Sequence, residues 1–214
     1  MKIVEGWYMP TYEQHFEKEI RKSGGEYQWW VREESFKYVT KWRTAIDVGA
    51  CIGLWTRDMV EKFDYVHAFE PFGDSGDCLI QNLHNKENYQ LHRNGLGDKE
   101  GIGRLYTSPN NIGTHFLTKL EPFESNMYED IQLKTLDSYN FKDVDYIKID
   151  VQTYELKVLE GAVETLKSNS PLLCVECARR THEEKNYVSN IVKFLDNLGY
   201  KQVGEYKKEI FFKK

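Results

Sequence analysis

Two glycines and one acidic residue have the spacing of a site for a nucleoside. Gly49 and Gly53 lie where a short apolar run passes into a helical pattern, and Glu70 ends the next apolar run. Glycine at such a turn lets the backbone approach a ligand closely and adopt positive φ. An acidic residue roughly 20 positions further on is placed to accept hydrogen bonds from ribose hydroxyls. Together these residues predict a site for a nucleoside-containing ligand.

The spacing of the glycines separates two classes of such ligand. A dinucleotide fingerprint reads G-x-G-x-x-G, and its central glycine admits the pyrophosphate. Residues 49–53 read G-x-x-x-G and lack that glycine. The pattern therefore disfavours an NAD-dependent oxidoreductase or epimerase, which we keep as an alternative. Taken alone, the turn is equally compatible with a glycine-punctuated bend that binds nothing.

Asp150 and Glu176 each end a further apolar run and are candidates for a general base. In an open parallel sheet, the carboxyl ends of the strands form the ligand edge. A carboxylate at that edge is placed to take the proton of an attacking hydroxyl. A helix cap is the alternative role for Asp150, because a helical pattern follows it. His182 is a third catalytic candidate, although a histidine in a charged loop is more often simply exposed.

From residue 44 onward the chain alternates between strand-like apolar runs and helical patterns. The predicted strands are 44–48, 65–69, 89–93, 146–149 and 172–176, and the predicted helices are 54–62, 75–85, 155–167 and 183–198. Two alternating stretches, 103–107 and 128–133, predict an antiparallel pair, and 200–206 with 209–212 predict a closing hairpin. This order implies an α/β, Rossmann-like sandwich with a mostly parallel sheet and a C-terminal antiparallel hairpin.

Residues 1–43 differ from the rest of the chain because they are charged and aromatic, with helical spacing at 12–22 and 32–41. We expect a helical N-terminal extension that packs on a main domain of residues 44–214. The full length of 214 residues fits one α/β domain with a sizeable core.

Charge, hydropathy and cysteine content restrict the possible partners. A formal net charge of −5 disfavours a surface that neutralises phosphates, so no nucleic acid partner is expected. No apolar run approaches the roughly 20 residues of a membrane helix, and the N-terminus has no signal-peptide pattern. We therefore expect a cytoplasmic protein with no membrane partner and with its cysteines as thiols. Cys174 and Cys177 lie three apart on a predicted strand and face opposite ways, so no metal or redox pair is predicted.

The motifs that contain these residues resemble those of the FkbM family of methyltransferases. They are residues 47–55, 68–71, 94–98, 134–137, 146–151, 154–156, 159–162 and 171–176. In this order they cover roughly residues 44–180. The resemblance implies a class I methyltransferase sandwich whose cofactor is S-adenosylmethionine. It also implies methyl transfer to an oxygen of a saccharide or another small hydroxylated acceptor.

The resemblance further implies which residues hold the cofactor. The glycine turn would lie under the methionine moiety, Glu70 would hold the ribose, and residues 94–96 would border the adenine. Asp150 would lie near the amino group or the acceptor. The complete set of implied cofactor-binding residues is Asp47, Gly49, Ala50, Cys51, Gly53, Leu54, Trp55, Glu70, Pro71, Asn94, Gly95, Leu96, Asp150 and Val151.

Two positions depart from the pattern of the family. Cys51 stands where the family usually has asparagine, and Gln152-Thr153 stands where it usually has a glutamate followed by a glycine. Loss of that carboxylate and glycine would change acceptor preference or weaken catalysis. A catalytically silent cofactor-binding module therefore remains an alternative. The sequence does not predict the oligomeric state.

Overall fold

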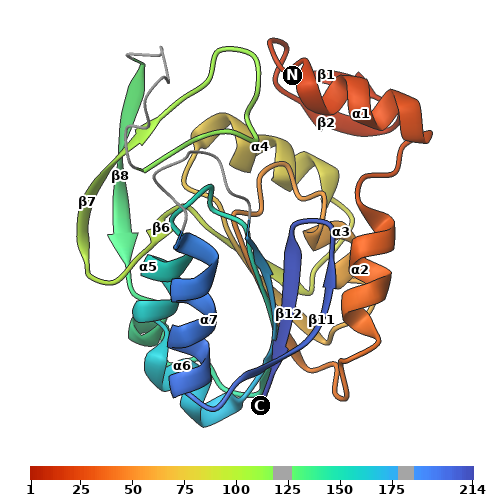
Figure 1. Cartoon of the computed structure of the whole chain (residues 1–214). Coiled ribbons are helices and arrows are strands. Elements are labelled where there is room, and N and C mark those ends of the chain that lie inside the picture. Colours follow the sequence, from red (N-terminus) through yellow and green to blue (C-terminus); the bar gives the residue numbers. More distant parts are fainter. Residues whose placement is uncertain (118–126, 178–185) are drawn as a thin grey trace.

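A seven-stranded sheet forms the centre of the molecule in the computed structural model, which describes residues 1–117, 127–177 and 186–214 (Figure 1). The strand order is β11-β12-β10-β9-β3-β4-β5. The strands are β3 (Thr44–Val48), β4 (Tyr65–Phe69), β5 (Tyr89–His92), β9 (Val144–Ile149), β10 (Leu172–Glu176), β11 (Lys201–Tyr206) and β12 (Glu209–Lys213). The strands from β10 to β5 are parallel, whereas β12 runs antiparallel to both β10 and β11. The predicted fold class is confirmed.

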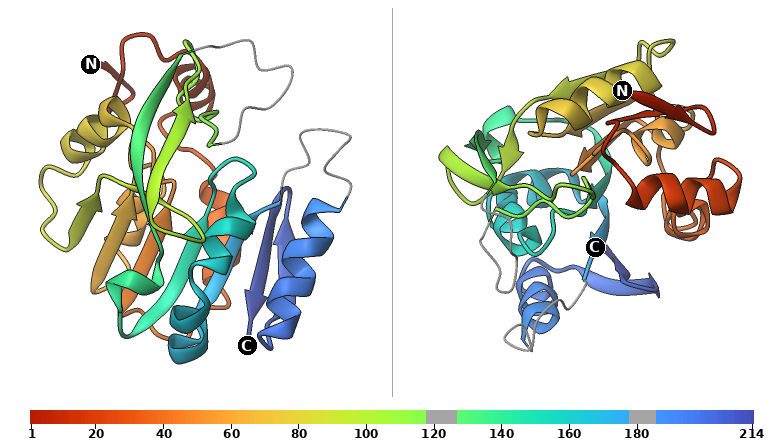
Figure 2. Two further views of the ribbon diagram at one scale, coloured as in Figure 1. Left: turned by 90° about the vertical axis from the view of Figure 1, so that its left-hand side faces the viewer. Right: turned by 90° about the horizontal axis from the view of Figure 1, so that it is seen from above.

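Helices cover both faces of this sheet (Figures 1 and 2). One face carries α5 (Glu155–Glu160), α6 (Val163–Asn169) and α7 (Tyr187–Asn197), and the other carries α2 (Trp29–Phe36), α3 (Thr56–Met59) and α4 (Gly73–Asn82). Because both faces are buried, the central strands are near-continuous apolar runs, which is why the sequence predicts them well. Cys174 and Cys177 lie in the cores on opposite faces and are free thiols, as predicted.

The single helix predicted at 155–167 is wrong, because the structure divides it into α5 and α6. Asp137 lies in the 3-10 helix Asp137–Tyr139, and its carboxylate accepts hydrogen bonds from the amides of Glu164 (3.0 Å) and Thr165 (2.7 Å). These are N-terminal amides of α6, which have no partner inside the helix. A cap from a distant segment therefore starts a second helix that local periodicity does not reveal.

A three-stranded sheet lies beside the main one and has the order β6-β8-β7. Its strands are β6 (Gly95–Leu96), β7 (Gly101–Tyr106) and β8 (Tyr128–Lys134). The antiparallel pairing of β7 with β8 is confirmed, whereas the short parallel strand β6 was not anticipated. Figure 2 shows β7 and β8 at the same end of the molecule as the N-terminal segment.

The N-terminal segment contains two helices, α1 (His15–Ser23) and α2, and a hairpin of β1 (Lys2–Val4) and β2 (Trp7–Met9) that the sequence did not predict. Its strands have only three residues each, too few for alternation to be recognised. The hairpin is fixed to α4 by Asn82, whose side chain bonds the amide (2.7 Å) and the carbonyl (2.9 Å) of Tyr8. The domain boundary at residue 43 remains a prediction.

None of the helices in the described ranges has both the length and the apolar character that a membrane span requires.

Candidate active site

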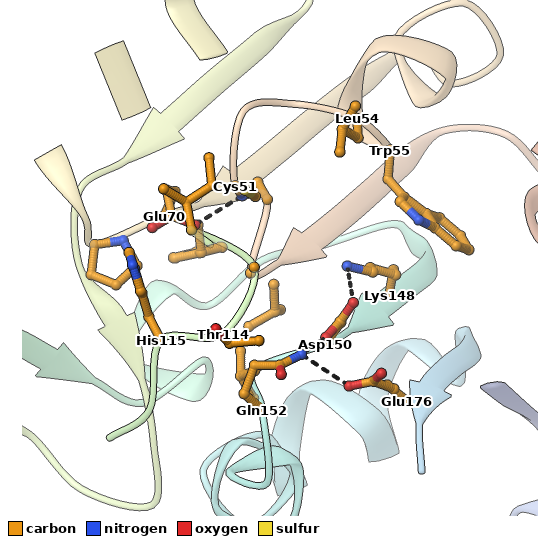
Figure 3. Close-up of a pocket in the computed structure, with 18 of the residues that line it drawn as sticks. Cys51, Leu54, Trp55, Glu70, Thr114, His115, Lys148, Asp150, Gln152 and Glu176 are labelled. Atoms are coloured by element: carbon orange, nitrogen blue, oxygen red, sulfur yellow. Dashed lines mark hydrogen bonds and ion pairs between the residues drawn. The ribbon is translucent and has the colours of Figure 1, made fainter. Parts of the chain in front are cut away.

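A cavity of about 420 Å³ opens at the carboxyl ends of β3, β4, β9 and β10 (Figure 3). Its volume lies in the range of small-molecule and cofactor sites. Most of the sequence-predicted residues line it, namely Gly49, Ala50, Cys51, Leu54, Trp55, Glu70, Pro71, Asn94, Gly95, Leu96, Asp150, Val151 and Glu176. Asp47 and Gly53 are not among the lining residues. His182 lies outside the described residues.

The glycine turn is shaped by close packing against the neighbouring loop. Gly49 has a φ of +81°, and a Cβ there would lie 2.0 Å from the carbonyl oxygen of Asp150. A side chain at this position would therefore push apart the loops that follow β3 and β9. Gly53, with a φ of +87°, packs against Leu83 and Leu79 of the α4 region instead of facing the cavity.

The backbone amides of the turn are already engaged. The amides of Gly49 and Ala50 donate to the carbonyl of Phe69 at 3.0 Å, and the amide of Cys51 donates to Glu70. The helix that follows has only four residues and begins at Thr56, later than the predicted start at residue 54. These amides are therefore not free to donate to a ligand. The turn instead contributes backbone that a ligand can approach closely.

Glu70 is the acidic group at the centre of the predicted nucleoside site. It is 8% exposed, and its two carboxylate oxygens accept bonds from the amides of Cys51 (2.8 Å) and Phe72 (2.9 Å). Burial raises the pKa of Glu70 to about 7, although both amides favour the charged form. An ionised carboxylate has about four acceptor positions, so two remain for ribose hydroxyls. The residues present therefore fit a nucleoside cofactor.

Lys148 is a buried cation that the sequence analysis missed. It is 4% exposed, and its Nζ lies 3.3 Å from Oδ2 of Asp150 and 3.8 Å from Oδ1 of Asp47. Burial alone would lower the pKa of Lys148, but Asp150 and Asp47 raise it above its ordinary value. The available signal was a lysine inside the apolar strand β9, which pairs in register with Asp47 of β3.

Asp47 belongs to the support of the site and not to its surface. The side chain is fully buried and accepts a hydrogen bond from Oγ1 of Thr56 at 2.7 Å. Burial raises the pKa of Asp47, while Lys148 and Thr56 act in the opposite direction. The carboxylate thus holds Lys148 in place beneath the cavity.

Asp150 and Glu176 are brought together, as Figure 3 shows, by the amide of Gln152. Nε2 of Gln152 donates to Oδ1 of Asp150 (2.8 Å) and to Oε2 of Glu176 (3.1 Å). Burial opposes ionisation of Asp150, but Lys148 and hydrogen bonds from the side chains of Glu176 and Gln152 lower the pKa of Asp150 below its ordinary value. Asp150 is therefore charged at neutral pH and can accept a hydrogen bond from a hydroxyl bound in the cavity.

A third carboxylate, Glu155, lies within 4.8 Å of this pair. Its oxygens accept bonds from the amide of Val151 (3.0 Å) and from the hydroxyl of Tyr187. Burial raises the pKa of Glu155 to about 7. Because the amide group of Gln152 lies between two of the three carboxylates, we assign no metal ion to them.

Segments outside the predicted motifs complete the walls of the cavity. They are the N-terminal residues His15, Phe16, Tyr27 and Gln28, the loop residues 111–115, and residues 207–209 of the closing hairpin. His115 in the loop is largely buried, and burial lowers its pKa to about 4. None of these residues lies in the motifs described above, and tertiary packing brings them to the cavity.

Comparison with known proteins decides the class of this site. A family model described as the methyltransferase FkbM domain matches residues 47–201. The chain belongs to the FkbM methyltransferase family. The family is one of methyltransferases, and the cofactor it implies is S-adenosylmethionine. No curated protein matches the chain.

Solved methyltransferase structures share the fold of this FkbM family member. The FkbM methyltransferase of Methylobacillus flagellatus KT is 16% identical with a TM-score of 0.58, covering 84% of this chain and 47% of its own. A Streptococcus mutans methyltransferase in complex with SAH is 15% identical with a TM-score of 0.56, covering 86% and 96%. An rRNA methylase of Streptococcus thermophilus is 14% identical with a TM-score of 0.53, covering 86% and 93%. The chain thus spans about half the length of the Methylobacillus protein.

Proposed function

We propose that the chain transfers the methyl group of S-adenosylmethionine to a hydroxyl of a saccharide or another small hydroxylated acceptor in the cytoplasm. The observation that supports this proposal is the cavity itself, because the buried carboxylate of Glu70 and the charged carboxylate of Asp150 both line it. The first suits a ribose, and the second suits the proton of an attacking hydroxyl.

The cofactor supplies a methyl group on a sulfonium, and the protein supplies position and electrostatics. Glu70 would hold the ribose, and the turn at residues 49–51 would lie along the methionine part. Asp150, kept ionised by Lys148 at 3.3 Å, would accept the proton of the acceptor hydroxyl as the oxygen attacks. Gln152 would hold Glu176 beside Asp150, because its amide donates to both carboxylates. The surrounding walls would exclude water.

A small acceptor that is methylated at an oxygen is favoured over a nucleic acid. One structural neighbour is named as an rRNA methylase, but at 14% identity the similarity shows only a shared fold. A formal net charge of −5 disfavours binding to a phosphate backbone. The carboxylates of Asp150 and Glu176 are groups that accept protons from hydroxyls, which supports an oxygen as the methylated atom.

The test is an acceptor screen with S-adenosylmethionine and a panel of methyl glycosides, free sugars and polyols. We expect release of S-adenosylhomocysteine and an O-methylated product, identified by mass spectrometry. Asp150→Asn should abolish turnover while the protein still binds S-adenosylhomocysteine, whereas the exposed control Asp130→Asn should behave as wild type. Cofactor binding without turnover of any acceptor would favour the silent module, and methylation at nitrogen would contradict the proposal.

A further inference from the structure

Tyr27 reaches the cavity from the N-terminal segment, outside the part of the chain that matches the family. The residue is partly buried, and its phenol hydroxyl makes no hydrogen bond to the described parts of the chain. A tyrosine that is partly buried usually finds a hydrogen-bond partner for its hydroxyl. An unsatisfied hydroxyl at the wall of a ligand cavity is therefore a candidate contact to whatever fills the cavity.

The position of the Tyr27 ring is well fixed. Its edge packs on Phe16 with ring centroids 5.1 Å apart and an interplanar angle of 82°. Its backbone carbonyl accepts a bond from the guanidinium of Arg32. The next residue, Gln28, accepts a hydrogen bond at 3.0 Å from the indole of Trp55, which itself lines the cavity. These contacts hold Tyr27 close to the glycine turn at residues 49–53.

Tyr27 lines the same cavity as Asp150 and Glu176. Burial raises the pKa of Tyr27 above its ordinary value, and the carboxylates of Asp150, Glu176 and Glu209 act in the same direction. The phenol consequently stays protonated and remains a hydrogen-bond donor across the working pH range. Two of those neighbours, Asp150 and Glu176, are the carboxylates assigned to the attacking hydroxyl.

We propose that the Tyr27 hydroxyl faces the transferred methyl group and binds the acceptor atom that attacks it. This inference rests on the proposed function and adds an acceptor-binding residue from the N-terminal segment. In the reaction, a lone pair of the acceptor oxygen forms the new C–O bond and the C–S bond breaks, which leaves S-adenosylhomocysteine. The hydroxyl proton passes to Asp150, while Tyr27 orients the acceptor and keeps its own proton.

Binding of two cofactor analogues tests this role without a known acceptor. S-adenosylhomocysteine has no group at the position of the methyl, whereas sinefungin has an amine there. Tyr27→Phe keeps the ring packed on Phe16 and removes only the hydroxyl. The matched control is Tyr12→Phe, which removes a hydroxyl of the same segment that bonds Asp74 at 2.7 Å and does not line this cavity.

Calorimetric titration should show that Tyr27→Phe lowers the affinity for sinefungin by about fivefold more than the affinity for S-adenosylhomocysteine. This is the effect expected of one lost hydrogen bond. Tyr12→Phe should leave the ratio of the two affinities unchanged. An unchanged ratio in Tyr27→Phe, or equal weakening of both ligands, would overturn the role of Tyr27 and leave the proposed function intact. If the wild type binds neither ligand, both proposals fall.

Discussion

At the scale of single residues, the site depends on carboxylates whose charge is set by their surroundings. Glu70 has a pKa raised to about 7 by burial, whereas Lys148 keeps Asp150 ionised well below that range. The two groups therefore differ across neutral pH. Asp150 stays charged while Glu70 titrates, so a change of cofactor affinity with pH should come from the protonation of Glu70.

Affinity for S-adenosylhomocysteine should depend on pH through Glu70. In the proposed binding mode the ionised carboxylate would accept bonds from both ribose hydroxyls, and it loses its charge as the pH falls through about 7. We expect binding to weaken by up to about tenfold for each pH unit below 7. His115 does not contribute, because burial lowers its pKa to about 4 and it stays neutral in this range.

Glu70→Gln serves as the control for this titration. The variant should bind S-adenosylhomocysteine more weakly than wild type at pH 8 and with no pH dependence between 6 and 8. Isothermal titration calorimetry at several pH values measures both effects. An equally steep pH dependence in Glu70→Gln would show that another group carries the titration.

Lys148→Met should lower the free energy of unfolding by about 3 kcal/mol or more, because it leaves buried Asp47 without its cation. The loss should be smaller at pH 5 than at pH 8, since burial already raises the pKa of Asp47 and favours its protonation. Urea denaturation measures the change. The control Lys201→Met removes an exposed pair with Asp196 and should cost less than about 1 kcal/mol. Equal costs for the two variants would contradict the buried role.

The sequence predicted the site residues that belong to a local pattern of turn and strand end. It missed the residues whose place in the site depends on contacts with distant parts of the chain. Glu70 and Cys51 follow from the spacing of a turn and a strand end, and both line the cavity. Lys148 looks like an interruption of an apolar strand until its pairing with Asp47 is known. Tyr27 has no local pattern at all, since the fold alone carries it to the cavity.

At the scale of elements, local pattern predicts strands better than it predicts where helices begin and end. Strands β4 and β10 have the predicted bounds, because each is a buried apolar run closed by polar residues. The divided helix and the three-residue strands β1 and β2 were missed. The cap that starts α6 comes from a distant part of the chain, whereas β1 and β2 are too short for alternation to be recognised.

Asp137→Ala should destabilise the fold by about 1–2 kcal/mol, the usual cost of a lost helix cap. The carboxylate bonds two amides and the hydroxyl of Thr165 at the start of α6. Thermal and urea unfolding measure the change. Asp130→Ala, at an exposed position on β8, should stay within about 0.5 kcal/mol of wild type. A neutral effect of Asp137→Ala would mean that α6 starts without this cap.

At the scale of the whole molecule, Glu13 connects the N-terminal segment to the loop over the cavity. The carboxylate is fully buried, and its oxygens accept bonds from the amides of Phe16 and Ile112, both at 2.7 Å. Residues from both segments line the cavity. The connection therefore joins two walls that are far apart in the sequence.

Glu13→Ala should cost about 2–4 kcal/mol, because it leaves two buried amides without acceptors. Hydrogen exchange at the Ile112 amide should accelerate, and affinity for S-adenosylhomocysteine should fall as the loop loosens. Glu13→Gln keeps one acceptor oxygen and should give an intermediate effect. Unchanged exchange at Ile112 in Glu13→Ala would contradict this connection.

The central claim is that the cavity binds S-adenosylmethionine through the turn at residues 49–51 and the carboxylate of Glu70. Calorimetric titration of wild type and Glu70→Ala with S-adenosylhomocysteine and with NAD tests it most directly. The account predicts that wild type binds S-adenosylhomocysteine and not NAD, and that Glu70→Ala loses at least about tenfold in affinity. Preference for NAD, or full affinity in Glu70→Ala, would contradict it.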